Sequence, residues 1–429
     1  MARKKRRRRR PLRTLVVAAL ALALLWAVFH RSLIRKVGGA SSQEPEAMAE
    51  GLSPESKALV ARALEGIEPG QLFDYHTHIV GMGTGDSGCF VNSHMLSWRH
   101  PVQRLKFLIY ASACGIDDVR SADEQFLTRL LSLVRSVEGH GRNLALAFDK
   151  HYGSDGQPVL DKTEFYVPND YVVKLARSNP DAFVPAISVH PYRSDALGEL
   201  DKWAAQGVRF VKWLPNAMGI DPANPRCVPF YQRMKEHGMV LLSHAGEEKA
   251  VAAEEAQKLG NPLRLRLPLG LGLKVILAHG ASLGTGEDLD DPGAERVDNF
   301  DLFLRLMEDD RFDEVLFADI SATLQYNRLD KPIRTLLERT DLHSRLVNGS
   351  DYPLPAINII VRTGALLDAG LITSDERDLL NEIYDYNPLL FDLVAKRTVR
   401  LPGAESGFPA SMFTVHPKLP VDPPKPESS

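Results

Sequence analysis

Short apolar runs of about six to eight residues recur along most of this chain, and longer amphipathic stretches separate them. Each run is bounded by turn residues, which is typical of a strand that is buried on both faces. Eight runs fit this description: 72–78, 143–149, 183–190, 208–214, 239–244, 274–279, 315–320 and 345–351. The stretches between them predict helices, among them 195–206, 229–237, 301–309 and 331–339.

Eight strands that alternate with helices predict an α/β fold in which parallel strands close into a (β/α)8 barrel, the TIM barrel. The span from about Gln71 to Arg397 is long enough for one such barrel. A doubly wound open sheet is the alternative architecture, because the order of strands and helices does not by itself show closure. We therefore expect the barrel and retain the open sheet as its competitor.

Polar side chains collect where several of the predicted strands end. His76 and His78 lie two residues apart at the end of the first strand, where such residues point to the same face. Two neutral imidazoles on one face form half of a metal site. Four more candidate ligands end other strands: Lys212, His244, His279 and Asp351. Each has an ordinary explanation alone, but together on the carboxyl-terminal rim of a barrel they predict an active site.

Five short motifs carry a resemblance to a known family: Asp-Tyr-His-Thr-His at 74–78, Val-Lys-Trp-Leu-Pro at 211–215, Ser-His-Ala-Gly at 243–246, Ala-His-Gly at 278–280 and Gly-Ser-Asp-Tyr-Pro at 349–353. With these motifs, and with Tyr-Asn-Pro-Leu-Leu-Phe at 386–391, the chain resembles the amidohydrolase superfamily. Within it, the chain is similar to the amidohydrolase-related group that contains aminocarboxymuconate-semialdehyde decarboxylase and resorcylate decarboxylases. The resemblance follows the order and spacing of the motifs over most of the chain.

The resemblance implies a role for each candidate ligand. His76, His78 and His244 would ligate a divalent metal, with zinc expected, and Asp351 would be the remaining ligand. A divalent metal lowers the pKa of a bound water to roughly 7, and a carboxylate within hydrogen-bond reach can take its proton as a general base. We assign that role to Asp351. His279 would polarise the substrate carbonyl or ligate a second metal.

Lys212 decides the expected number of metal ions. In two-metal members of the superfamily, a lysine on the fourth strand is carboxylated and bridges the ions, so Lys212 and His279 would complete a second site here. An ordinary lysine would instead contact a substrate carboxylate. The Lys-x-x-Pro setting of Lys212 resembles members with a single ion. We therefore expect one ion and retain two as the alternative.

Other polar residues on the rim have weaker claims. His190 and Arg193 end the third strand and are candidates for substrate binding. Glu247 and Glu248 are expected to begin a helix, where carboxylates suit the positive end of the helix dipole. Asp319 ends the seventh strand, as a partner of a metal ligand or as a turn residue. The sequence offers no basis for choosing between these two roles of Asp319.

Three functions are compatible with these residues. The first is a metal-dependent hydrolase that cleaves a C–N or C–O bond of a small molecule. The second is a mononuclear-metal decarboxylase, a carboxy-lyase that uses the same ligands. The third is a barrel that binds a ligand or a partner at the membrane surface without turnover, but a binding protein needs no base such as Asp351 beside a metal. We expect the hydrolase and retain the decarboxylase as the alternative.

The N-terminus has a different character from the rest of the chain. Residues 1–13 contain a dense run of arginine and lysine, and residues 14–34 are largely apolar. This order is typical of an export signal, and the extension to Ile34 makes the segment long enough for an uncleaved transmembrane anchor. A cleaved signal is the alternative. Because positive residues stay in the cytoplasm, we expect a membrane-anchored catalytic domain that is exported, as in a periplasmic or other extracytoplasmic protein.

The remaining boundaries follow from composition. Residues 35–56 are a predicted linker, residues 57–400 the barrel, and residues 401–429 a proline-rich tail that packs in part through Phe408 and Phe413. The net charge of −3 combines the basic N-terminus with an acidic catalytic domain, so a nucleic-acid partner is not expected. Three cysteines imply no disulfide framework. The sequence leaves the oligomeric state open, and a homo-oligomer is compatible with it.

Overall fold

A sheet of eight parallel strands forms the centre of the molecule. The computed structural model describes residues 32–39, 43–251, 253–293 and 295–421. All eight strands fall within the eight apolar runs of the sequence or within one residue of them. In their order around the sheet they are β1 (Phe73–His78), β3 (Arg142–Leu146), β5 (Phe183–Ile187), β6 (Phe210–Trp213), β7 (Val240–Ser243), β8 (Val275–Leu277), β11 (Leu316–Asp319) and β12 (Leu346–Val347).

Backbone hydrogen bonds join the last strand and the loop after it to the first strand. The N–H of Tyr75 donates to the carbonyl of Asn348 at 2.9 Å. The N–H of His78 donates to the carbonyl of Tyr352 at 3.0 Å. The sheet therefore closes into a barrel, which confirms the predicted fold class over the doubly wound alternative.

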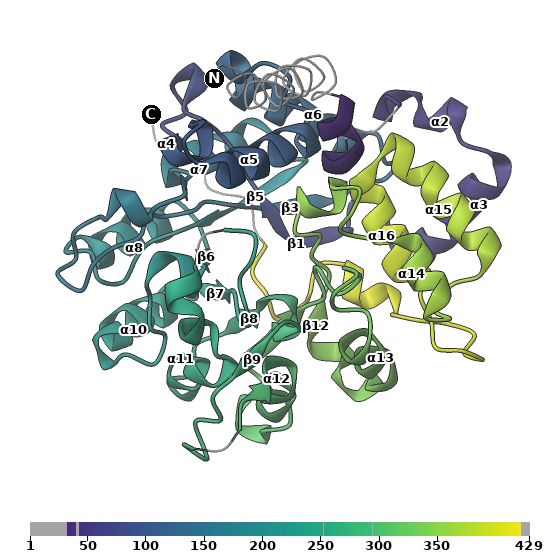
Figure 1. The fold of residues 1–429 in the computed structure, drawn as a ribbon. Coiled ribbons are helices and arrows are strands. Elements are labelled where there is room, and N and C mark those ends of the chain that lie inside the picture. Colours follow the sequence, from purple (N-terminus) through teal and green to yellow (C-terminus); the bar gives the residue numbers. More distant parts are fainter. Residues whose placement is uncertain (1–31, 40–42, 252, 294, 422–429) are drawn as a thin grey trace, which may run out of the picture.

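Helices surround the strands (Figure 1). Four of them, α8, α10, α12 and α13, match the predicted helices 195–206, 229–237, 301–309 and 331–339. Among the described residues from 43 onward, the α-helices are α2 (Met48–Gly51), α3 (Pro54–Leu64), α4 (Ser93–Leu96), α5 (Pro101–Ala113), α6 (Ala122–Arg135), α7 (Asn169–Ser178), α8 (Ala196–Ala205), α9 (Pro215–Met218), α10 (Val228–Glu236), α11 (Arg266–Gly270), α12 (Asn299–Met307), α13 (Lys331–Glu338), α14 (Thr363–Asp368), α15 (Ser374–Tyr386) and α16 (Pro388–Thr398).

Local sequence explains where the last helices begin. Thr373 and Glu376 form a capping box at the start of α15, in which each side chain bonds a backbone N–H near the other. At α16, the side chain of Asn387 accepts from two backbone N–H groups, and Pro388 occupies the first turn. The Tyr-Asn-Pro motif of the sequence is thus a helix start, and it places α16 against the barrel.

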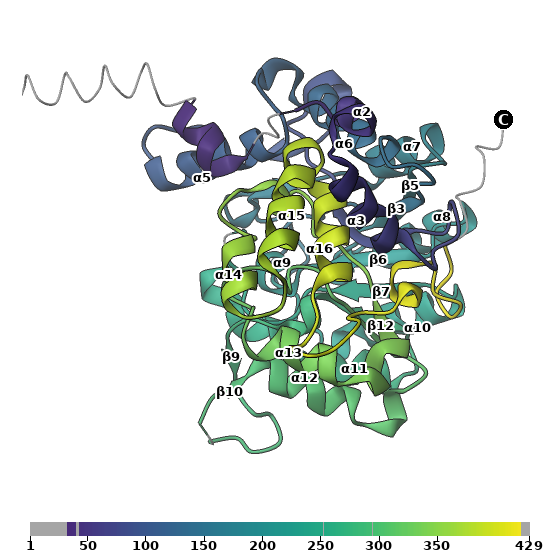
Figure 2. The same cartoon turned by 90° about the vertical axis from the view of Figure 1, so that its right-hand side faces the viewer.

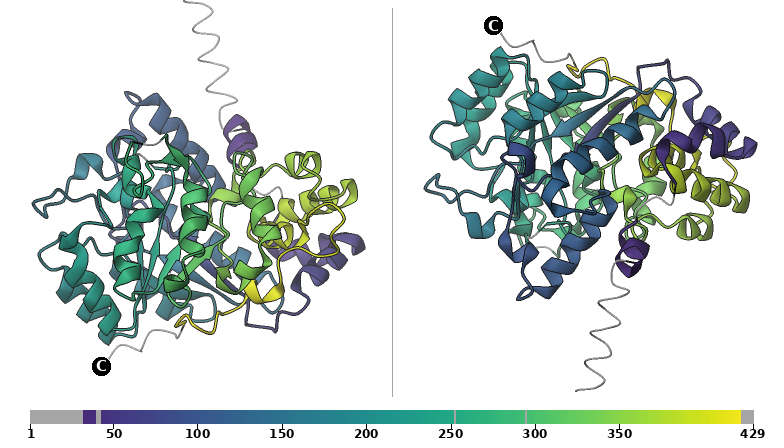
Figure 3. Two further views of the ribbon diagram at one scale, coloured as in Figure 1. Left: turned by 90° about the horizontal axis from the view of Figure 1, so that it is seen from below. Right: turned by 90° about the horizontal axis from the view of Figure 1, so that it is seen from above.

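The barrel interior is a core of its own, filled by side chains such as Phe73, Phe210 and Phe317. The C-terminal segment adds Leu419 to this core. In Figure 3 that segment, drawn in yellow, lies on the opposite side of the molecule from α5. Phe408 and Phe413, predicted contacts of the tail, are also buried, against the helices outside the barrel. The described part of this segment, up to residue 421, therefore packs on the folded domain through Phe408, Phe413 and Leu419.

A long insertion follows β1 and shapes the region above the strand ends. It contains α4, α5 and α6, together with β2 (Phe90–Val91), which pairs antiparallel with β4 (Phe165–Tyr166). A second antiparallel pair, β9 (Thr285–Gly286) and β10 (Val297–Asp298), follows β8. Figure 2 shows α5, α6 and α7 gathered at one end of the view, with α11, α12 and α13 at the other. The insertion therefore adds a layer on one side of the barrel.

The structure describes only part of the N-terminal region, residues 32–39 and the chain from residue 43 onward. The predicted tail and most of the predicted anchor, 14–34, lie outside the described residues. Within the described part of the chain, no helix combines the length and the apolar character that crossing a bilayer requires. Part of the predicted linker 35–56 differs from expectation, because Met48 and Leu52 are buried in the core outside the barrel. Their apolar side chains hold this part of the segment on the folded domain.

Candidate metal centre

Three candidate ligands meet where β1 and the loop after β12 lie side by side. Nε2 of His76 lies 3.3 Å from Nε2 of His78. Oδ1 of Asp351 lies 3.2 Å from Nε2 of His78 and 3.6 Å from Nε2 of His76. In a tetrahedral zinc site with bonds of about 2.0–2.1 Å, ligand atoms are about 3.3 Å apart. The three side chains therefore have a spacing that fits one divalent cation.

His279 joins these residues from the end of β8. The ligand atoms of His76, His279 and Asp351 all lie within 4.8 Å of one another. Both His279 (φ 59°) and Asp351 (φ 61°) adopt the left-handed backbone region. That region costs a non-glycine residue on the order of 1–3 kcal/mol and is maintained only where the surroundings demand it. The backbone thus holds both side chains at one place at an energetic cost, which is typical of a functional site.

Asp319, at the end of β11, orients two of the histidines. Its Oδ2 lies 2.9 Å from Nδ1 of His76, and its Oδ1 accepts the backbone N–H of His279 at 3.0 Å. Ser321 lies beside it, with Oγ 2.7 Å from Nδ1 of His279. A carboxylate on the second nitrogen of a histidine is the usual support of a metal ligand. Of the two roles left open by the sequence, the structure favours the partner of a candidate ligand.

His244 follows β7 and lies close to His279. Within the described part of the chain, its Nε2 is buried and has no hydrogen-bond partner. Its Nδ1 lies 3.5 Å from Oε2 of Glu248, and its ring centroid lies 5.1 Å from that of His279. A buried polar atom without a partner costs about 1–3 kcal/mol. A bound cation would remove that cost, although His244 is not part of the 4.8 Å group of His76, His279 and Asp351.

Lys212, on β6, contacts the centre directly. It is 1% exposed, and its Nζ lies 2.9 Å from Nε2 of His76. Burial lowers the pKa of Lys212 to about 8, against the raising effect of the Asp319 and Asp351 carboxylates. No carboxylate of the described residues lies within 4.0 Å of its amine. Both predicted roles, a carboxylated bridge and a plain cation, remain compatible with this position.

Burial sets the protonation of the imidazoles. It lowers the pKa of His76, His244 and His279 well below the usual 6.5, and the nearby positive charge of Lys212 adds to the effect. At Asp351, burial would raise the pKa, but the hydrogen bond from His78 and the neighbouring charges hold it below its usual range. Neutral imidazoles and an ionised carboxylate are the forms that ligate metals.

All six candidate residues line one cavity of about 130 Å³, which we call the chamber. They are His76, His78, Lys212, His244, His279 and Asp351. Its other walls come from the insertion after β1, from the ends of β3 and β4 and from the loop after β7, and they are mainly apolar. The residues predicted from strand ends are therefore gathered at one end of a single cavity.

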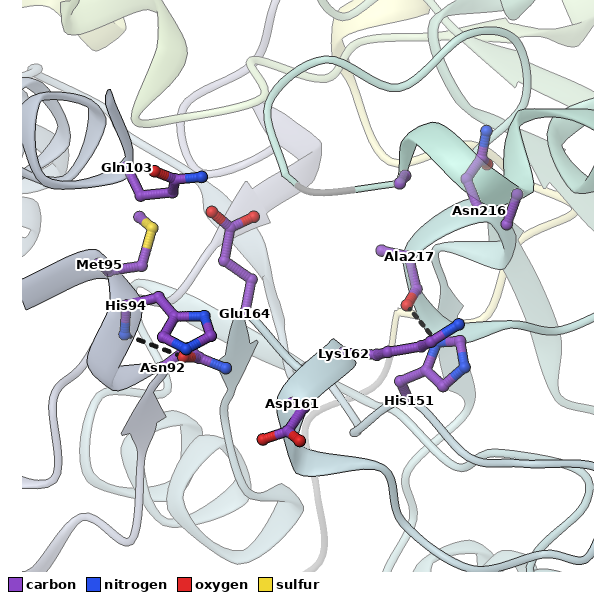
Figure 4. Close-up of a pocket in the computed structure, with 12 residues that line it drawn as sticks. Asn92, His94, Met95, Gln103, His151, Asp161, Lys162, Glu164, Asn216 and Ala217 are labelled. Carbon is purple, nitrogen blue, oxygen red and sulfur yellow. Dashed lines mark hydrogen bonds between the residues drawn. The ribbon is translucent and has the colours of Figure 1, made fainter. Parts of the chain in front are cut away.

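A second cavity has a volume of about 270 Å³, and two of its lining residues, Asn92 and Glu164, adjoin chamber residues in the sequence. Figure 4 shows Gln103 and Glu164 on one side of it and Lys162 and His151 on the other. The Nδ1 of His151 lies 2.9 Å from the carbonyl oxygen of Ala217. This cavity contains none of the candidate ligands, so we keep it separate from the metal centre.

The structure does not bring His190 and Arg193 to the chamber. Nε2 of His190 lies 3.0 Å from the carbonyl oxygen of Met218, and its Nδ1 accepts the N–H of Tyr192 at 3.1 Å. Nη1 of Arg193 donates to Oδ2 of Asp149 at 3.0 Å. Neither residue is among those that line the chamber. Because the protein itself satisfies their polar groups, the predicted substrate contact gains no support from the structure.

Two further charged residues near the centre were not anticipated as parts of the site. Glu248 was expected to begin a helix, but no helix begins there, and its Oε1 accepts the N–H of Val251 at 3.0 Å beside the chamber. Arg328 is 8% exposed and donates from Nη1 to Oγ of Ser282 at 2.8 Å, while its Nε has no partner among the described residues. Neither ends an apolar run, so strand periodicity contains no signal for them.

Comparison with known proteins gives one family. A sequence model described as Amidohydrolase matches residues 145–389, which is more than half of the chain. No curated protein matches it. Similar solved structures include an uncharacterised TIM-barrel protein from Bordetella bronchiseptica, with 17% identity, coverage of 72% of this chain and 98% of that chain, and a TM-score of 0.43. Another is 4-oxalomesaconate hydratase from Rhodopseudomonas palustris, with 14% identity, coverage of 76% of this chain and 98% of that chain, and a TM-score of 0.39. A third is 5-carboxyvanillate decarboxylase from Sphingomonas paucimobilis, with 12% identity, coverage of 76% of this chain and 96% of that chain, and a TM-score of 0.40.

Proposed function

Because the chain belongs to the amidohydrolase family, we propose that it is a metal-dependent hydrolase that cleaves a C–N or C–O bond of a small molecule. The observation that carries this proposal is the triangle of His76, His78 and Asp351, whose ligand atoms are 3.2–3.6 Å apart in a buried cavity. Such a spacing suits the ligand atoms of a divalent ion.

The residues present fit one ion, and zinc is the metal that three imidazoles and a carboxylate suit. We assign His76, His78 and Asp351 to it, with His244 as a further ligand because its buried Nε2 has no partner among the described residues. The ion would supply Lewis acidity, which activates water and polarises a carbonyl near neutral pH. Lys212 and His279 are the residues that would extend the site to two ions.

Asp351 is the proposed general base. Its lowered pKa keeps the carboxylate ionised at neutral pH, so it can accept a proton from the attacking water. It would then return that proton to the leaving oxygen or nitrogen. His279 lines the chamber and is held through its Nδ1 by Ser321, so it is suited to orient the substrate carbonyl. Asp319 acts through His76 and His279 as a positioning residue.

A decarboxylase is the second candidate, and Lys212 is the observation that favours it. Its buried amine lines the chamber and has no carboxylate of the described residues within 4.0 Å. A substrate carboxylate could take that place as the ion-pair partner. In this reaction the bond between the carbon skeleton and the carboxylate breaks, CO2 leaves, and a proton replaces it on the carbon.

We also propose that residues 14–34 anchor the protein in a membrane with the barrel exported, as the basic N-terminus indicates. Membrane fractionation of cells, followed by protease treatment of intact cells or spheroplasts, tests both parts. Recovery in the membrane fraction with a protease-accessible barrel is expected. A protease-protected barrel in intact spheroplasts would contradict the orientation.

Metal content tests the proposed function first. The whole chain, purified without a histidine tag, is analysed by mass spectrometry for bound metals. One equivalent that disappears in His76→Gln is expected. Two equivalents, of which at least one disappears in Lys212→Ala, would indicate a bridging carboxylated lysine. No metal after metal-replete growth would overturn the proposal.

Product analysis then separates the two reactions. A panel of esters, lactones and amides is assayed for acid release, and a panel of aromatic and enoic acids for CO2. Acid release without CO2 is the expected result. CO2 release alone would replace the hydrolase with the decarboxylase.

A further inference from the structure

The walls of the chamber are apolar away from its metal end. Six of the side chains that form them are Met82, Phe107, Ile116, Phe148, Phe165 and Val167. They come from the insertion after β1, including α5, and from the segments after β3 and around β4. These walls would bury the part of a substrate that lies away from the reacting bond.

The polar groups on these walls are already bound within the protein. The hydroxyl of Tyr110 donates to the carbonyl of Ala250 at 2.9 Å. The carboxyl group of Glu248 accepts the backbone N–H groups of Ala250 and Val251. Among the described residues that line the chamber, Lys212 is the only lysine or arginine, and it lies at the metal end beside His76. Arg328 is near but is not part of the lining.

Strand alternation explains why the charged neighbours are elsewhere. On β2 and β4 and just beyond their ends, successive side chains point to opposite faces. Val91 and Phe165 line the chamber, while the adjacent Asn92 and Glu164 line the second cavity shown in Figure 4. The apolar residues of the β2–β4 pair thus separate its polar residues from the chamber.

We propose that the substrate is a neutral carbonyl compound with an apolar body, an ester, lactone or amide of an aliphatic or aromatic acid. This inference rests on the proposed hydrolase function and adds the substrate class. The carbonyl lies at the metal end, and the body packs on the apolar walls. An anionic group on the body would meet no lysine or arginine of the described lining there.

The reaction balances with water alone. The oxygen of water bonds to the carbonyl carbon, and the bond from that carbon to the leaving oxygen or nitrogen breaks. One proton of the water passes through Asp351 to the leaving group, which departs as an alcohol or amine. The other product is a carboxylic acid, which ionises at neutral pH.

A substrate series on the whole metal-loaded chain tests the inference. Phenyl acetate, phenyl butyrate and phenyl hexanoate lengthen the apolar body, and monophenyl glutarate is an anionic counterpart of phenyl butyrate. We expect kcat/KM to rise by about fourfold per added methylene, the value for its full burial. We expect monophenyl glutarate to be at least about a hundredfold poorer than phenyl butyrate. Equal or better turnover of monophenyl glutarate would overturn the inference while leaving the hydrolase in place.

A charge placed on the wall sharpens the test. Met82 is half-buried, so Met82→Lys can add a cation without filling the core. We expect it to lower kcat/KM for phenyl hexanoate and to raise it for monophenyl glutarate, each by at least about tenfold. The matched control is Val102→Lys on the outer face of α5, where Val102 is 74% exposed. It is expected to change neither value. If Met82→Lys does not fold, the ester series on the unmodified protein still tests whether the substrate is neutral and apolar.

A binding measurement distinguishes failure of the inference from failure of the hydrolase proposal. If none of the esters is hydrolysed, the neutral fluorescent probe N-phenyl-1-naphthylamine is titrated into the protein and into Met82→Lys in the same detergent. Saturable binding that Met82→Lys abolishes would support an apolar ligand and reject the hydrolase. Absence of saturable binding to the unmodified protein would overturn the inference.

Discussion

Two clusters of histidine and charged residues lie at the carboxyl ends of the barrel strands, and they differ in how their polar atoms are satisfied. In the metal centre, Nε2 atoms of His76 and His78 face each other at 3.3 Å, and Nε2 of His244 has no partner among the described residues. In the second cluster, which we call the Asp149 cluster, His190 and Arg193 bond to Asp149.

The Asp149 cluster is complete without a ligand. Asp149 is 1% exposed and accepts from the backbone N–H of His190 and from the guanidinium of Arg193. Both ring nitrogens of His190 are also bonded. Similar residue types therefore serve structure in one place and, as proposed here, metal chemistry in the other. One buried nitrogen without a hydrogen-bond partner among the described residues, Nε2 of His244, distinguishes the metal centre from the Asp149 cluster.

The largest expected difference between the clusters is in activity. Asp351→Asn removes the proposed base and should lower kcat/KM by at least about a thousandfold, within the range for a general base. Asp149→Asn is the matched control, since it makes the same change in the other cluster. Its folded protein should keep kcat/KM within about threefold, because Asp149 does not line the chamber. Full activity of Asp351→Asn would reject the mechanism.

The next effect is on stability and belongs to the Asp149 cluster. Arg193→Met leaves Asp149 buried without its cation, which should reduce the free energy of unfolding by about 3 kcal/mol in urea titrations. The double variant Asp149→Asn/Arg193→Met should recover part of this loss, because no unpaired charge remains. A raised KM with unchanged stability in Arg193→Met would instead restore the substrate contact predicted from the sequence.

Metal removal should affect the other cluster alone. At a free zinc concentration of 100 times its dissociation constant, binding should stabilise the metal-stripped protein by about 2.7 kcal/mol. Differential scanning fluorimetry should show this as a rise in Tm. The rise should disappear in His76→Gln and remain in His190→Gln. Loss of the rise in both variants would mean that the clusters are not independent.

The smallest expected effect is the pH dependence of His190. Burial lowers the pKa of His190 to about 3 in the folded protein, whereas the unfolded chain binds a proton near the usual 6.5. The free energy of unfolding therefore decreases as the pH falls from 6.5 towards 3, by roughly 2 kcal/mol at pH 5.

The variant His190→Asn isolates this contribution. Urea titrations at pH 7 and pH 5 should show a smaller loss of stability in His190→Asn than in the unmodified protein. The histidines of the metal centre contribute equally to both proteins, so they cancel in the difference. Equal losses in the two proteins would place the pKa of His190 near its usual value.

Most of the fold could be predicted from the sequence, because the signals are local. Apolar runs predicted the strands, and amphipathic spacing predicted helices such as α8 and α12. Strand ends identified all six side chains that line the metal end of the chamber. The same rule also selected His190 and Arg193, because a strand end does not reveal whether the protein already satisfies a polar group. Met48 and Leu52 were assigned to a linker because the sequence does not show what surface they meet.

The sequence by itself determined the order of the elements and the residue types that the carboxyl ends of the strands offer. Only the tertiary structure decided which of them meet. Closure of β12 on β1 brings Asp351 to His76 and His78 across most of the chain, and β11 places Asp319 behind His76. The physical reason is that strand formation depends on neighbours in the chain, whereas a metal centre depends on distances of a few ångströms between atoms that only closure of the barrel sets.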